Sequence, residues 1–153
     1  MAEVRPAACA AIEPGYRFSR THTFDEAQVR SFARAAGDEN PMHHDSEFAR
    51  GTHIGGLIAS GTHTTSLLMG LTATHFARRG TVLGLGFSVD LLSPVLATET
   101  VRMEWSVTSI AARSRGGYIV ELQGSIKGRD GRTRVLAHGT VLFTPDQWVH
   151  CAA

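Results

Sequence analysis

The sequence predicts one α+β domain in which a long helix lies on one face of an antiparallel sheet. The chain has 153 residues, of which 42% are hydrophobic and 19% charged, as is typical of a single globular domain. Residues 61–79 contain no proline and carry an apolar stripe, which indicates a helix that packs on a core. The chain after Gly80 is rich in alternating apolar and polar residues and is divided by short glycine-containing turns, which indicates antiparallel strands.

The domain is expected to cover residues 15–145. Residues 1–14 form an alanine-rich lead-in interrupted by Pro6 and Pro14, and we expect them to be loosely ordered. Residues 146–153 are expected to form a C-terminal tail. The sequence contains no internal repeat or low-complexity segment, so one domain accounts for it.

Composition and charge argue against several classes of function. The net charge is +1 and the basic residues are scattered, so the chain lacks the basic surface typical of nucleic-acid-binding proteins. No apolar stretch is long enough for a membrane span, and the apolar run near the N-terminus is too interrupted for a signal peptide. Cys9 and Cys151 have no CxxC spacing, which suits free thiols in a reducing compartment. We therefore expect a cytoplasmic protein with no membrane or nucleic-acid partner.

Local signals place the elements of the first half. A strand is expected over residues 16–23, and Asp25 is suited to cap a helix that ends at Gly37. Asp45 is expected to cap a short helical turn that ends at Arg50. The segment between Gly37 and Asp45 is therefore a loop between two helices.

The second half is predicted to be strands. Every second residue from Val101 to Val107 is apolar, so these side chains are expected on the buried face of the sheet. The expected strands cover residues 81–91, 99–110, 118–127 and 132–144.

The loop after Gly37 carries the residues best suited to chemistry. Asp38 and His43 offer a carboxylate and an imidazole five residues apart, and such a pair can hold a water molecule and transfer protons near neutral pH. Asn40 and Pro41 would stiffen the loop and fix the separation of the pair. Because Asp, Asn and Pro are also common turn residues, the same segment could be only a well-formed loop.

A second candidate lies at the start of the long helix. The backbone N–H of Gly61 is suited to bind a substrate oxygen that gains negative charge. Gly61 could also be a small residue required for close packing, and the two roles are compatible. Ser60 and Thr62 flank it, and together with Asn40 and Pro41 they are the expected substrate-binding residues.

A histidine-rich segment overlaps this region. It contains the potential metal ligands His43, His44, Asp45 and His53. Adjacent histidines usually point in different directions, and no further ligand has a recognisable spacing. We therefore expect no metal site.

These residues resemble the pattern of the MaoC-like dehydratase family, which includes the (R)-specific enoyl-CoA hydratases. The family pattern is an aromatic residue shortly before Gly-Asp-x-Asn-Pro-aliphatic-His, with a small residue six positions after the histidine. Phe32, residues 37–43 and Ala49 match it, and the resemblance covers most of residues 16–144. Further matching positions are residues 56–61, Leu83, Gly84 and Pro94.

The resemblance implies a hot-dog fold, in which a curved antiparallel sheet wraps around a central helix and two copies usually form a homodimer. It also implies that Asp38 and His43 act on a water molecule, and that the Gly61 N–H binds a thioester carbonyl oxygen. The implied reaction is reversible hydration of trans-2-enoyl-CoA to 3-hydroxyacyl-CoA of the R configuration. The acyl-CoA is then both substrate and partner, and the implied reaction needs no metal or redox cofactor.

The chain departs from many relatives at two positions. Ser60 stands where many carry a histidine, and Met69 lies near a position where some hydratases have a serine. The resemblance therefore leaves the acyl-chain specificity open. Three alternatives share the fold: a hot-dog acyl-thioesterase, an acyl-carrier-protein dehydratase and a non-catalytic acyl-binding module.

Overall fold

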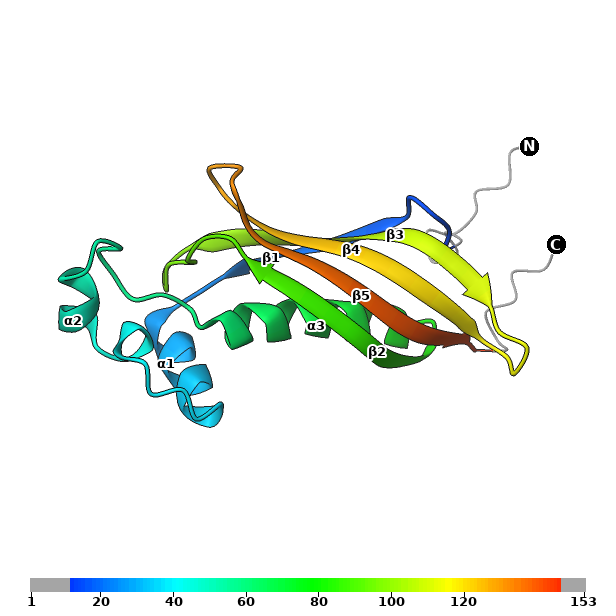
Figure 1. Cartoon of the computed structure of the whole chain (residues 1–153), viewed down its shortest axis with the longest axis horizontal. Helices are drawn as coiled ribbons and strands as arrows, with labels where there is room; N and C mark the ends of the chain where they lie inside the picture. The colour runs from blue at the N-terminus through cyan, green and yellow to red at the C-terminus, as the bar shows by residue number, and fades with distance from the viewer. Residues whose placement is uncertain (1–11, 147–153) are drawn as a thin grey trace, which may run out of the picture.

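The computed structural model describes residues 12–146, which form one curved antiparallel sheet with a long helix along its face (Figure 1). Residues 1–11 of the predicted lead-in and 147–153 of the predicted tail lie outside the described residues. The strand order in the sheet is β1-β3-β4-β5-β2. The elements are β1 (Arg17–Thr23), α1 (Glu26–Ala35), η2 (Pro41–His43), α2 (Ser46–Arg50), α3 (Gly61–Ala77), β2 (Gly80–Leu91), β3 (Thr100–Ala112), β4 (Tyr118–Gly128) and β5 (Thr133–Pro145).

The predicted arrangement of one central helix and five antiparallel strands is confirmed. Each expected strand is present within two residues of its predicted ends, and α3 begins at Gly61 as predicted. The helix ends at Ala77 with Arg78 as its C-cap, slightly before the predicted end. The short 3₁₀ helix η2 was not predicted, because three residues show no periodicity.

The end of α1 fixes the position of the chain at Asp38. Gly37 adopts a φ of 71°, a left-handed conformation that glycine enters without steric cost. Its N–H donates to Arg34 O at 3.1 Å, and the Asp38 N–H donates to Ala33 O at 2.8 Å. This pair of bonds is a Schellman motif, which ends the helix with defined geometry.

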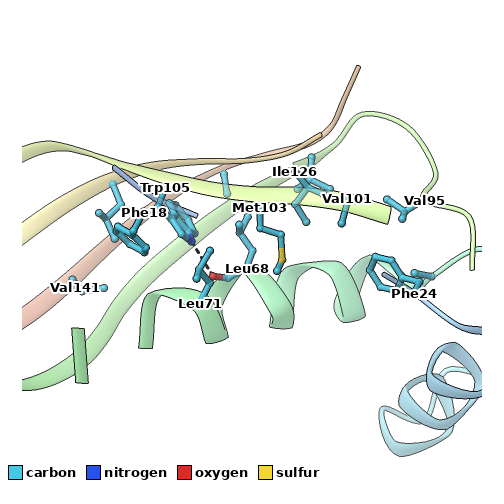
Figure 2. Packing of buried hydrophobic residues seen from close by; sticks show 14 of the residues in the cluster. Phe18, Phe24, Leu68, Leu71, Val95, Val101, Met103, Trp105, Ile126 and Val141 are labelled. Atoms are coloured by element: carbon cyan, nitrogen blue, oxygen red, sulfur yellow. Dashed lines mark hydrogen bonds between the residues drawn. The ribbon is translucent and has the colours of Figure 1, made fainter. Parts of the chain in front are cut away.

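The core lies between the sheet and α3 (Figure 2). The alternation predicted for β3 is confirmed, because every second side chain from Val101 to Val107 is buried. Trp105 is fully buried, and its indole N–H donates to the carbonyl oxygen of Leu68 in α3 at 2.8 Å. A Cβ added to Gly124 on the neighbouring strand would lie 2.5 Å from Trp105 Cε3, so this position requires glycine. These contacts fix α3 against the sheet.

The strand β2 forms one edge of the sheet and leaves apolar side chains exposed. Its register with β5 shifts between Gly84 and Gly86, which marks a β-bulge. Leu83 and Leu85 are 57% and 55% exposed. An edge strand with large exposed hydrophobic residues is suited to pair with another chain.

None of the helices within residues 12–146 has the length and apolar character needed to cross a membrane.

Candidate active site

The predicted loop holds Asp38 in a defined orientation. One carboxylate oxygen, Asp38 Oδ1, accepts a hydrogen bond from the Asn40 N–H at 3.0 Å. The side chain of Asn40 caps η2, since its Oδ1 accepts the Met42 N–H at 3.1 Å, and Pro41 is the first residue of η2. The turn residues therefore do form a well-made loop, and this loop leaves the second carboxylate oxygen of Asp38 free to face His43.

His43 is fixed by a contact across the site. Its Nδ1 lies 2.8 Å from Ile58 O, and because a carbonyl oxygen can only accept, Nδ1 carries the proton of this bond. The Ile58 N–H donates in turn to Met42 O at 3.1 Å, so the segment before α3 is bonded to η2 in both directions. In a neutral His43 ring, Nε2 is then the unprotonated nitrogen.

Asp38 and His43 come together as predicted. Asp38 Oδ2 lies 3.4 Å from His43 Nε2. The side chain of His43 is only 7% exposed, whereas that of Asp38 is 33% exposed, so the carboxylate is the member of the pair open to solvent. A water molecule within reach of both atoms can donate to either and direct a lone pair at an electrophilic carbon.

His44 holds the backbone of Asp38, a role that the sequence did not reveal. Its Nε2–H donates to Asp38 O at 2.6 Å. Arg30 of α1 donates through Nε to His44 O at 3.0 Å and through Nη2 to Ser46 Oγ at 2.6 Å. The only sequence signal for this bracing was the adjacency of His44 to His43.

His63 of α3 contacts α1, so it holds the helix that leads to Asp38 against the helix that begins at Gly61. Its ring is buried and stacks on Phe32 of α1, with the ring centroids 4.4 Å apart. Burial lowers the pKa of His63, and the nearby His22 lowers it further, so the ring is neutral at neutral pH. A neutral ring suits this position, because a cation in the first turn of a helix would oppose the helix dipole.

The first turn of α3 places Gly61 at the site. Ser60 is the N-cap, with its Oγ accepting the His63 N–H at 3.2 Å and lying 3.1 Å from Thr62 Oγ1. Gly61 is the first helical residue, and N–H groups of the first turn have no partner within a helix. The Gly61 N–H is therefore placed at the positive end of the α3 dipole.

Gly61 is also a packing position, as its second predicted role requires. A Cβ added to Gly61 would collide with Cδ1 of Leu91, the last residue of β2. The side chain of Leu91 therefore lies directly against the start of α3.

In the described part of the chain, cavities lie along α3 and the elements beside it. The first, the Asp38 cavity, has a volume of about 440 Å³ and is lined by Asp38, Gly61, Thr62, Thr65, Ser66, Val89 and Leu91. The second, the His43 cavity, measures about 350 Å³, and its lining includes His43, Ile58, Gly61, Leu91 and Pro94. The third, the Met69 cavity, measures about 240 Å³ and lies farther along α3, lined in part by Met69, Gly70, Val82 and Phe87.

The structure therefore brings Asp38, His43 and Gly61 to one place, at the wall that the first two cavities share. Thr62 lines the Asp38 cavity. The side chains of Asn40 and Ser60 make local hydrogen bonds instead, so substrate binding by these residues and by Pro41 stays a prediction. Among residues 12–146, no group of three or more His, Cys, Asp or Glu side chains is arranged to hold a metal ion.

Comparison with known proteins relates the chain to a family. A model of the MaoC-like domain matches residues 8–124. Over 99 residues the chain is 31% identical to an (R)-specific enoyl-CoA hydratase of Aeromonas caviae, covering 65% of this chain and 73% of that protein.

Solved structures agree with this match. The (R)-hydratase of Aeromonas caviae involved in PHA biosynthesis has a TM-score of 0.77 at 29% identity, covering 88% of this chain and 98% of that one. A MaoC-like dehydratase from Rhodospirillum rubrum has a TM-score of 0.75 at 26% identity, covering 92% of this chain and 97% of that one. The fold is thus the predicted hot-dog fold, and the chain belongs to the MaoC-like domain family.

Proposed function

We propose that the protein catalyses the reversible hydration of a trans-2-enoyl-CoA to the (R)-3-hydroxyacyl-CoA. The observation that carries this proposal is the contact of Asp38 Oδ2 with His43 Nε2 at 3.4 Å, beside the first N–H of α3. The similarity to an (R)-specific enoyl-CoA hydratase supports the same reaction.

The start of α3 stabilises the charge that develops on the substrate. Attack of water at C3 of the enoyl thioester moves an electron pair to the thioester oxygen, which gains negative charge in the transition state. The Gly61 N–H, at the positive end of α3, donates to this oxygen. Because the charge is largest in the transition state, this bond lowers the barrier more than it strengthens substrate binding.

Asp38 and His43 transfer a proton from the attacking water to C2 of the substrate. Asp38 accepts a proton from the attacking water while His43 Nε2 holds the same water in place, and the hydroxyl group forms its bond to C3. The pair then returns one proton to C2, so the water is divided between C3 and C2 and both residues end in their initial state. The proposed reaction needs no metal or redox cofactor.

The Asp38 cavity and the Met69 cavity both lie between α3 and β2, and we propose that together they form one groove for a thioester substrate. Near Asp38 its wall carries the hydroxyl groups of Thr62, Thr65 and Ser66, which can bond to polar groups next to the thioester. Farther along α3, Met69 and Phe87 line an apolar end that fits an acyl chain.

We also propose that the protein works as a homodimer. The edge strand β2 exposes Leu83 and Leu85, and the Met69 side chain beside it on α3 is also exposed. A second copy paired along β2 would cover these apolar side chains and close the open side of the groove.

Purified protein incubated with crotonyl-CoA tests the reaction and separates the alternatives. Loss of the enoyl absorbance without release of free thiol is the expected result. Release of thiol would instead identify a thioesterase, and binding without either change would identify an acyl-binding module. A strong preference for crotonyl-acyl-carrier protein over crotonyl-CoA would favour the carrier-protein dehydratase.

A further inference from the structure

Leu91 occupies a position that the proposed mechanism does not use. It is the last residue of the edge strand β2, and it is 59% exposed. Its Cδ1 lies against Gly61, and its Cδ2 lies 3.6 Å from the position that a Cβ on Gly61 would take. A large aliphatic side chain thus covers the start of α3 without being part of the buried core.

Leu91 also lies between the Asp38 cavity and the His43 cavity. The Asp38 cavity and the His43 cavity are separate, and Gly61 and Leu91 line both of them. Since Asp38 Oδ2 and His43 Nε2 are 3.4 Å apart, a carbon attacked by water held between them must lie close to the wall that the two cavities share. The Leu91 side chain therefore forms the wall beside the reacting atoms.

The position of Leu91 relates to one atom of the substrate. With the thioester oxygen at the Gly61 N–H and C3 at the water held by Asp38, C2 lies between them, next to Gly61. The side chain against Gly61 is that of Leu91. We propose that Leu91 determines substrate specificity by excluding a branch at C2 of the acyl thioester, an inference that rests on the proposed function.

Two CoA thioesters that differ by one methyl group on C2 test this directly: crotonyl-CoA and its trans-2-methyl derivative. The measured quantity is the kcat/KM for the branched substrate divided by that for the unbranched one. A hydrophobic contact with one methyl or methylene group is worth about 10–200-fold in such a ratio, so Leu91→Ala should raise the ratio by about 10-fold or more. Leu91→Phe, which enlarges the wall, should lower it.

Leu136→Ala is the matched control. Leu136 pairs with Asp90 on the adjacent strand, is 36% exposed, and, among the described residues, is not part of the lining of the three cavities. The same change of side chain should therefore leave the ratio as in the wild type. Because the two substrates are compared within each variant, the lower intrinsic reactivity of the branched thioester cancels.

Calorimetric titration with butyryl-CoA and 2-methylbutyryl-CoA gives a second readout that does not depend on turnover. The binding ratio is the association constant of the branched thioester divided by that of the unbranched one. If the wild type hydrates crotonyl-CoA but neither ratio changes in Leu91→Ala, the role of Leu91 is overturned and the proposed function stands. If no variant hydrates either enoyl-CoA but the binding ratio rises in Leu91→Ala, the hydratase proposal fails and the role of Leu91 stands. Absence of both hydration and binding overturns both.

Discussion

Replacing Gly61 by proline removes the N–H proposed to bind the thioester oxygen. Proline suits the first position of a helix, and Ser60 before it has a ψ of 152°, within the range that a residue before proline prefers. The obstacle is steric, because any Cβ at this position collides with Leu91 Cδ1. Both Gly61→Pro and Gly61→Ala should therefore be made in a Leu91→Ala background, where that contact is absent.

The comparison of these two variants isolates one hydrogen-bond donor. Both add a Cβ, but only proline removes the N–H. Loss of one oxyanion donor costs about 10²–10³ in kcat, or about 3–4 kcal/mol, so the proline variant should be slower than the alanine variant by this factor. The KM for crotonyl-CoA should change much less, because the bond forms mainly in the transition state.

Thermal unfolding of both variants is the control for this experiment. Equal melting temperatures would assign the difference in rate to the N–H and not to damage at the start of α3. If both fold and turn over crotonyl-CoA at the same rate, Gly61 is only a packing residue beside Leu91, and the oxyanion role is refuted.

Three further predictions concern assembly and stability. Sedimentation should show a wild-type dimer and a Leu85→Glu monomer, and a wild-type monomer at micromolar concentration would contradict the dimer. Burial, with Arg79 and Arg78, lowers the pKa of His75 from 6.5 to about 4, so the unfolded chain binds a proton that the folded chain does not. The contribution of His75 to the free energy of unfolding should be fully present above about pH 6.5 and should be lost as the pH falls toward 4. The variant His75→Phe should reduce this loss. An unchanged dependence of the unfolding free energy on pH in the variant would rule out the contribution of His75. Gly124→Ala should lower the free energy of unfolding by about 1–3 kcal/mol in chemical denaturation, because its Cβ would overlap Trp105, and equal stability would contradict this packing.

Much of the fold could be predicted because it depends on local patterns. Burial of alternate residues in β3 gives a period that is visible in the sequence, and Asp25 caps α1 as its position before the helix predicts. The Asp38–His43 pair could be predicted for a similar reason, since both residues lie in one short loop whose turn chemistry is local.

The contacts that complete the site could not be predicted in this way. Ile58 O, which fixes the proton on His43 Nδ1, is 15 residues away in the chain and acts through its backbone, which has no sequence signature. Leu91 meets Gly61 only because β2 returns along α3. The sequence offered His44 only as a potential metal ligand, whereas in the structure its ring donates a hydrogen bond to the Asp38 carbonyl oxygen.

The most direct test of the central claim is the turnover of crotonyl-CoA by Asp38→Asn, His43→Gln and the double variant. Each single change keeps the approximate shape of the side chain but removes proton transfer, which is typically worth about 10²–10⁴-fold. Because both groups act on one water molecule, the double variant should be little slower than the slower single variant. Folded variants that hydrate crotonyl-CoA at the wild-type rate, or losses that multiply in the double variant, would contradict the shared role of Asp38 and His43.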